Sequence, residues 1–233
     1  MKVTPAPTGV PQKQVVNIFS YDAEHFGSQS IHIKRLFHKY KCKIAVVDGN
    51  GLGAGLVDFL VIDQDDPDTG EPLGALGVYN DDDGLYKKFL NNAAYPMPNS
   101  LYIMKANAKI NSELYAYCQS QMGSGKIHFL IDENTAKNKL LSQSQSKRMT
   151  KAKRADYLRP YVLTSILEDQ MMNLVEENEG MNIVLKQNNR TIKKDKFSAL
   201  IYALSYPRMI EEKGGRKHRG DLSKLMLFTS AKR

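Results

Sequence analysis

The stretch Ile44-Ala45-Val46-Val47-Asp48-Gly49-Asn50-Gly51-Leu52-Gly53-Ala54-Gly55 decides the fold expected for this chain of 233 residues. Four consecutive apolar residues predict a buried strand that ends at Asp48, and the glycines behind it predict a tight turn. A helix is expected from about Gly53 to Leu60. A buried strand that delivers a carboxylate into a glycine-lined turn is typical of an active site, so Asp48 is the first candidate site residue.

The flanking sequence continues the alternation of strands and helices. Residues Val15 to Ser20 predict a strand, and Gly27 to Tyr40 a helix with Ile33, Leu36 and Phe37 on its inward face, capped by Ser28 or Ser30. This succession predicts an α/β fold. Further strands are expected near 76–78, 101–104, 127–131 and 183–185, and further helices over about 108–121 and from Pro160 through Glu179.

A second lone acid, Asp195, stands at the start of the helical stretch Lys196–Leu204. Its side chain could cap that helix or reach a cation. Two carboxylates at the ends of regular elements suggest metal-dependent chemistry on phosphate, and we expect Asp48 and Asp195 to lie close enough to share cations.

Charge is distributed unevenly along the chain. Residues 1–138 hold 13 Lys and Arg against 15 Asp and Glu, whereas residues 139–233 hold 20 against 10. A polyanion is the natural partner of such a basic part, although a solvated surface has the same composition. We expect the residues that contact DNA to lie in a basic mobile loop over 141–154, around Asp195 and in a basic tail over 211–233. They are Lys147, Arg148, Lys151, Lys153, Arg154, Lys194, Lys196, Arg216, Lys217 and Arg219.

Composition limits the class of protein. A hydrophobic content of 42% is sufficient for the core of one large domain, or of one domain with an appendage. No run approaches the roughly 18 apolar residues of a membrane span, and the first residues lack a signal-peptide core, so no membrane partner is expected. Cys42 and Cys118 are too few for a disulfide scaffold and are interpreted as buried thiols.

Two phosphate-binding patterns were weighed against this interpretation. Gly49-x-Gly51-x-x-Ala54 after a strand approaches a dinucleotide fingerprint, but an acid at the strand tip would repel the pyrophosphate unless a metal intervened. Gly123-Ser124-Gly125-Lys126 is not a P-loop, because Ile127 stands where the magnesium-binding hydroxyl belongs. A nucleotide-binding enzyme of the Rossmann type is therefore kept as an alternative function of this chain.

Four segments of the chain carry a resemblance to a known family. They are Tyr21–Phe26 with the helix that contains Gln29 and Ile33–Phe37, Val46–Gly53 with Asp58, Ile127–Leu130, and Lys194–Leu204. Over roughly residues 15–206 the chain resembles the C-terminal nuclease domain of the large terminase subunit of tailed bacteriophages, the motor that packages and cuts phage DNA.

The resemblance implies a ribonuclease H-like fold, a mixed sheet flanked by helices. It implies a two-ion site for Mg²⁺ or Mn²⁺ and hydrolysis of double-stranded DNA without a covalent intermediate. The family pattern places catalytic, metal-binding acids on Asp48 and Asp195, and Asp63 is an additional candidate ligand. The implied partners are double-stranded DNA, the terminase ATPase portion, the small subunit and the portal or capsid. The implied location is the host cytoplasm and, transiently, the procapsid portal.

The family pattern also has a first acid on an opening strand that this chain does not contain. We therefore expect a leader over residues 1–14, a nuclease domain over 15–210 without its first strand, and the basic tail. Such a chain is expected to cleave DNA feebly or not at all by itself. The alternative function is a catalytically silent module that binds DNA or docks on the motor.

Overall fold

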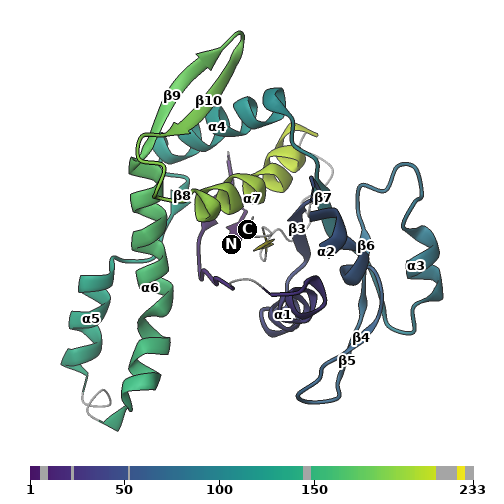
Figure 1. The fold of residues 1–233 in the computed structure, drawn as a ribbon. Helices are drawn as coiled ribbons and strands as arrows, with labels where there is room; N and C mark the ends of the chain where they lie inside the picture. Colours follow the sequence, from purple (N-terminus) through teal and green to yellow (C-terminus); the bar gives the residue numbers. More distant parts are fainter. Residues whose placement is uncertain (6–9, 22–23, 52, 144–147, 214–224, 229–233) are drawn as a thin grey trace.

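The computed structural model describes residues 1–5, 10–21, 24–51, 53–143, 148–213 and 225–228. Its centre is a parallel sheet of four strands in the order β11-β3-β7-β6. Figure 1 shows helices on both sides of this sheet. Two extensions project from it, the helices over residues 133–142 and 151–172 and the hairpin over residues 174–187. The strands are β3 (Ile44–Asp48), β6 (Ala75–Val78), β7 (Pro96–Met104) and β11 (Leu225–Phe228).

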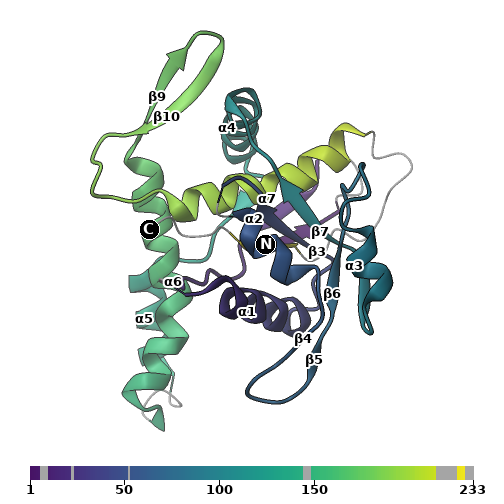
Figure 2. The ribbon, with the colours of Figure 1, turned by 45° about the vertical axis from the view of Figure 1, so that its right-hand side comes forward.

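Alternation along β3 divides the core between the two faces of the sheet. Ala45 and Val47 pack with α1 (Phe26–Lys39) and α2 (Gly53–Leu60) on one face. Ile44 and Val46 pack with α4 (Ala108–Gly123) and α7 (Asp195–Glu212) on the other. Figures 1 and 2 both place α1 and α7 on opposite sides of β3. The α/β class is therefore confirmed, as are the strand ending at Asp48 and the helix after it.

The start of α1 differs from the expectation. The expected helix is present, and its face with Ile33, Leu36 and Phe37 is buried. Its cap, however, is neither Ser28 nor Ser30. The Nδ1 atom of His25 accepts the hydrogen bond of Gly27 N–H at 3.2 Å, and the Ser30 hydroxyl donates back to the Gly27 carbonyl.

The N-terminal residues do not form a leader outside the domain. They supply β1 (Lys2–Thr4) and β2 (Gln12–Gln14), which form a second sheet with β8 (Ile127–His128). Val3 and Lys13 are fully buried, and the Lys13 ammonium donates to Gln121 and to Glu211 at 2.8 Å each. The strand expected at Val15–Ser20 is not formed: β2 ends at Gln14, and after Val15 N–H, which donates to the His128 carbonyl, the backbone finds no neighbouring strand in the described chain.

A small region connects β3 to β7 along the chain. It contains the short hairpin of β4 (Gln64–Asp65) and β5 (Pro72–Leu73), then β6, and then α3 (Lys87–Asn92). Arg35 of α1 holds the hairpin loop through ion pairs with Asp66 at 2.5 Å and Asp68 at 2.6 Å.

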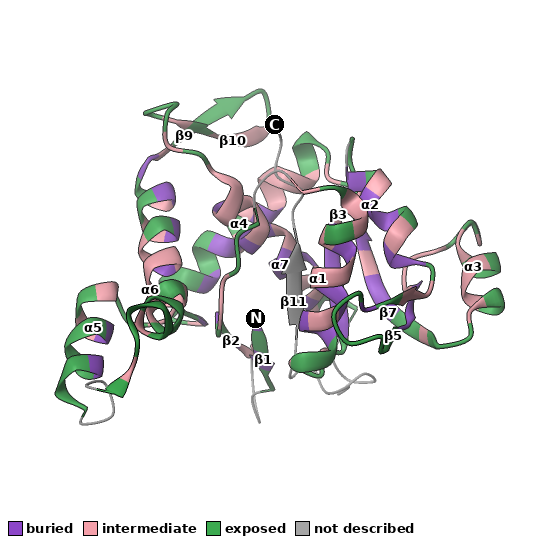
Figure 3. Ribbon diagram, turned by 60° about the horizontal axis from the view of Figure 1, so that its bottom comes forward, coloured by how far each residue is buried: buried purple, intermediate pink, exposed green. Residues whose placement is uncertain are grey.

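The basic loop expected over 141–154 is helical at its two ends, since residues 141–142 belong to one helix and 151–154 to the next, and residues 144–147 lie outside the described chain. Helices α5 (Glu133–Ser142) and α6 (Lys151–Met172) pack against each other as a helical hairpin. Asp132 caps α5 by accepting from Thr135 N–H, and Thr150 caps α6 by accepting from Lys153 N–H. Figure 3 shows α5 largely exposed, and Figure 1 shows this hairpin, here called the helical arm, projecting from the sheet.

The helix expected to run from Pro160 through Glu179 stops at Met172. Residues 174–187 form the hairpin of β9 (Leu174–Glu179) and β10 (Asn182–Gln187) instead. Gly180 makes this possible, because it takes φ +64° in the two-residue turn. Ile183 N–H donates to Ser112 Oγ at 2.8 Å, which ties β10 to α4.

The last part of the chain is not wholly a tail. Helix α7 continues to Glu212, and β11 pairs in parallel with β3, opposite Ile44–Val47. Residues 214–224 and 229–233 of the expected tail lie outside the described chain. No helix of the described residues has the length and the apolarity needed to cross a membrane.

Candidate functional site

The carboxyl edge of the parallel sheet changes direction between β3 and β7. These strands are neighbours, and Asp48 lies opposite Met104 in the register. The chain leaves β3 toward α2 on one face of the sheet but leaves β7 toward α4 on the other. Ligands of open α/β sheets bind in the crevice that such a switch in direction creates. Asp48 is the last residue of β3 and therefore stands at this crevice.

Two glycines allow the turn after Asp48 to lie close against its neighbours. A Cβ atom on Gly53 would lie 1.7 Å from the Asp48 carbonyl oxygen, and one on Gly49 would lie 2.3 Å from Ile103 Cγ2. Both distances are far below a van der Waals contact, so any side chain at these positions would displace the strand end. The glycines singled out in the sequence are needed for close packing of the backbone.

The Asp48 carboxylate is only partly engaged. Its Oδ1 atom accepts from Asn50 N–H at 3.0 Å, and the Asn50 side chain donates to the Ala106 carbonyl at 2.9 Å, which bridges the two strand ends. Oδ2 accepts no hydrogen bond from the described parts of the chain. Burial, together with the Asp48 charge, raises the pKa of Tyr202 on α7 to about 12. Asp48 thus faces α7 with one oxygen open.

Asp195, the first residue of α7, does not cap its helix. The Oε1 atom of Gln170 accepts instead from Lys196 N–H at 2.9 Å and Phe197 N–H at 3.1 Å. The half-buried Asp195 carboxylate makes no hydrogen bond or ion pair within the described residues. Of the two roles weighed for Asp195, the cap is therefore taken by another side chain.

Asp48 lies beside α7, the helix that begins at Asp195. It lies farther along this helix than the first turn. Asp48 faces Tyr202, seven residues after Asp195. At 1.5 Å per residue, these two positions on α7 are about 10 Å apart along the helix axis.

Asp63 lies at the opposite edge of the sheet from Asp48. Its two oxygens accept from Ala75 N–H at 2.9 Å and from Ala94 N–H at 2.6 Å. Ala75 is the first residue of β6, and Ala94 precedes the start of β7. Asp63 therefore joins the amino ends of these two strands by hydrogen bonds. The candidate ligand Asp63 therefore does not join Asp48, because the length of the strands separates them.

The Asp48 carboxylate at the crevice suits a hard divalent ion that takes its remaining ligands from water or from a bound molecule. Mg²⁺ is commonly held by one or two carboxylates together with water and substrate phosphate, and Asp48 offers such an oxygen. Within the described ranges, no group of three or more His, Cys, Asp and Glu side chains is arranged to hold a metal ion. Water and the oxygens of a bound ligand would have to complete the coordination.

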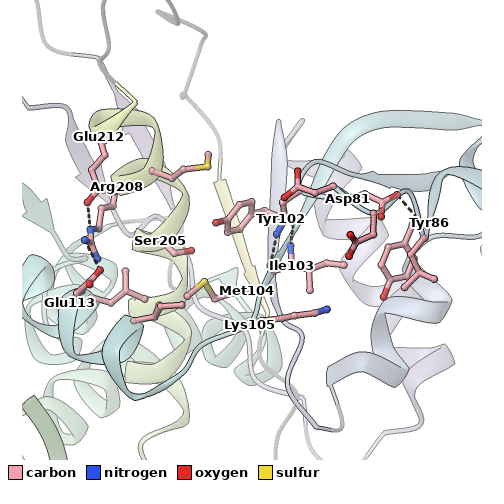
Figure 4. A pocket seen from close by; sticks show the side chains of 17 residues that line it. Asp81, Tyr86, Tyr102, Ile103, Met104, Lys105, Glu113, Ser205, Arg208 and Glu212 are labelled. Carbon is pink, nitrogen blue, oxygen red and sulfur yellow. Dashed lines mark hydrogen bonds and ion pairs between the residues drawn. The ribbon is translucent and has the colours of Figure 1, made fainter. Parts of the chain in front are cut away.

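A pocket of about 420 Å³ opens beside this crevice, at the end of β7. Figure 4 shows its walls, formed by α4 and α7 on one side and by the loop after β6 on the other. Arg208 is neutralised there by Glu113 at 2.9 Å and Glu212 at 2.6 Å. Lys105, the residue after β7, also lines the pocket. The sequence reasoning did not single it out, although it directly follows an expected strand.

The basic candidates are spread over three regions. Arg148, Lys151 and Lys153 are exposed at the far end of the helical arm, whereas the Nε atom of Arg154 is buried without a hydrogen-bond partner in the described chain. Lys194 Nζ donates to the Leu185 carbonyl at 3.3 Å and so holds β10, and the half-buried Lys196 lies in the first turn of α7. The candidates outside the described residues are Lys147, Arg216, Lys217 and Arg219.

Comparisons with known proteins give no relative: no family model, no curated protein and no solved structure matches the chain.

Proposed function

We propose that this chain is a metal-dependent endonuclease domain of a phage DNA-packaging terminase, with a ribonuclease H-like fold and double-stranded DNA as substrate. The observation that carries the proposal is the position of Asp48 at the change of direction between β3 and β7, on the face of the sheet that α7 covers and with no hydrogen bond to Oδ2 from the described residues. The resemblance of four segments to terminase nuclease domains supports the same assignment.

In this proposal Asp48 holds a divalent ion at the crevice, and Asp195 contributes to the second ion. Bound Mg²⁺ or Mn²⁺ ions would polarise the scissile phosphate and stabilise the attacking and leaving oxygens of an in-line displacement. The chain itself supplies rigid placement, because Asn50 fixes the turn and Gly49 and Gly53 let it approach β7 closely.

The helical arm would bind the duplex away from the cleavage site. From Lys151 to Gln170, where α6 meets α7, the helix rises about 28 Å. This approaches one turn of duplex DNA, so a duplex could contact both the exposed cations of the arm and the sheet edge. The proposed partners in the motor are the ATPase portion, the small subunit and the portal, in the host cytoplasm.

A module that binds DNA or docks on the motor without cutting it is the second candidate. It is favoured by the position of the exposed cations Arg148, Lys151 and Lys153, which lie between the end of α5 and the first turn of α6 and not at the end of β3.

Plasmid nicking in Mn²⁺ separates the two functions. The nuclease proposal predicts feeble nicking by the chain alone, which EDTA abolishes, which Asp48→Asn and Asp195→Asn reduce to background and which Asp63→Asn retains. DNA binding with no Mn²⁺-dependent nicking would support the silent module, whereas undiminished nicking by Asp48→Asn would contradict Asp48 as a metal ligand.

A further inference from the structure

A basic loop over residues 188–194, here called the β10–α7 loop, connects the hairpin to α7. It contains Arg190, Lys193 and Lys194 and no acid. The Lys194 ammonium is used within the fold, because it donates to the Leu185 carbonyl. Arg190 and Lys193 are exposed, and their side chains make no hydrogen bond or ion pair within the described residues. Two of the three cations of this loop are therefore available to a ligand.

Asn173, the residue after α6, fixes the shape of the β10–α7 loop. Its buried side chain donates to the Asn189 carbonyl at 2.8 Å and accepts from Asn189 N–H at 2.8 Å. Its own carbonyl accepts from Asn188 N–H at 2.8 Å. The Oδ1 atom of Asn189 accepts in turn from Thr191 N–H at 3.0 Å and from the Thr191 hydroxyl at 2.8 Å. A loop held in this way loses little conformational entropy when its exposed side chains bind a ligand.

The β10–α7 loop and the exposed lysines of the helical arm lie at opposite ends of α6. Lys151 and Lys153 are in the first turn of this helix, and Asn173 directly follows its last residue. The 22 residues of α6 rise about 33 Å at 1.5 Å per residue. One turn of duplex DNA has nearly the same length, about 34–36 Å. Figure 2 shows the loop projecting beside the end of α6, between β10 and α7.

Resting on the proposed function, we infer that the β10–α7 loop is a second contact with the backbone of duplex DNA, in which Arg190 and Lys193 each bind a phosphate oxygen. Guanidinium and ammonium groups bind phosphate by charge-assisted hydrogen bonds that do not read the bases. The arm holds the duplex at one end of α6 and the loop holds it at the other. Because Lys193 stands two residues before Asp195, the second contact brings the duplex to the start of α7.

The test measures duplex affinity by fluorescence anisotropy over a range of salt concentrations, in EDTA, for the whole chain. One double variant, Arg190→Gln with Lys193→Gln, removes both charges of the loop. A second, Arg190→Lys with Lys193→Arg, keeps them. The matched control is Lys87→Gln with Lys88→Gln, since both lysines are exposed on α3, which Figures 1 and 2 place on the other side of the molecule from α6.

Removal of both charges from the β10–α7 loop should weaken binding roughly tenfold or more, as expected for the loss of charge-assisted hydrogen bonds. It should also reduce the slope of log affinity against log salt by about 1.8, because two phosphate contacts are lost. The variant that keeps the charges should retain most of the affinity and the slope. The control on α3 should bind as the unmodified chain does. Both loop residues are exposed, so these substitutions should leave folding intact.

Two results would overturn the inference. The first is a charge-removing variant that binds DNA with the affinity and the slope of the control. The second is an equal loss in the charge-conserving variant, which would show that the loop acts through its shape and not through its charge. The proposed function is judged separately by Mn²⁺-dependent nicking that requires Asp48. If nicking is present and the loop variants bind as the control does, the proposed function stands without this contact. If the charge-removing variant loses affinity but no chain nicks DNA, the contact stands and the nuclease proposal fails.

Discussion

The Gln170 side chain of α6 accepts the Lys196 N–H at the start of α7, at 2.9 Å, and so takes the position that the Asp195 carboxylate would otherwise fill as a helix cap. The Asp195 carboxylate therefore does not stabilise the start of its own helix. Stability and metal binding at this helix start should respond to different substitutions.

Gln170→Ala should lower the free energy of unfolding by about 1–2 kcal/mol, because two N–H groups of the first turn of α7 lose their acceptor. Asp195→Asn should leave it nearly unchanged. Urea unfolding of both variants measures this. A larger loss for Asp195→Asn than for Gln170→Ala would show that Asp195 is the true cap.

Asp63 should be a structural residue. Asp63→Ala removes the acceptor of Ala75 N–H and Ala94 N–H, so the free energy of unfolding should fall by about 2 kcal/mol or more. Binding of Mn²⁺, followed by its electron paramagnetic resonance signal at a temperature where the variant is folded, should be unchanged. Weaker Mn²⁺ binding with unchanged stability would restore Asp63 as a ligand.

Lys34 should make stability depend on alkaline pH. Its side chain is fully buried, and this desolvation lowers its pKa from 10.5 to about 8 in the folded chain. Between these values the unfolded chain binds more protons, so this contribution to stability is present above pH 10.5 and is lost as the pH falls through 8. The shift corresponds to about 3 kcal/mol.

Unfolding from pH 7.5 to 10.5 tests this effect by comparison with Lys34→Met. The stability of the unmodified chain should rise with pH relative to the variant. Parallel curves of stability against pH for the two chains would show that the pKa of Lys34 is the same in the folded and the unfolded state.

The helical arm should supply part of the salt dependence of DNA binding. Replacing Lys151 and Lys153 by Gln should reduce the slope of log affinity against log salt by up to about 1.8, if each contacts one phosphate. The matched control replaces Lys41 and Lys43, which are exposed at the amino edge of the sheet. Equal slopes for the two double variants would exclude the arm as a specific DNA contact.

Local patterns predicted the parts of the fold that depend on neighbouring residues. Four apolar residues before Asp48 and the glycines after it gave β3 and α2 with their bounds, because burial and turn chemistry are both local there. The caps Asp132 and Thr150 were readable signals for α5 and α6, but the polar, basic composition between them suggested a loop.

Other features depend on contacts between distant segments. Leu174–Glu179 has little apolar alternation, and it is a strand because it pairs with β10, which is itself held on α4. Spacing along the chain likewise does not reveal that Asp63 lies at the amino edge and Asp48 at the carboxyl edge.

The central claim is that a divalent ion binds at Asp48 beside α7, and iron-directed cleavage of the polypeptide tests it most directly. Fe²⁺ in place of Mg²⁺, with ascorbate and peroxide, cuts the backbone near the bound ion, and mass spectrometry locates the cuts. We predict cuts near Asp48 and between Asp195 and Tyr202, both lost in Asp48→Asn and suppressed by excess Mg²⁺. Cuts confined to other segments, or unchanged in Asp48→Asn, would contradict the claim.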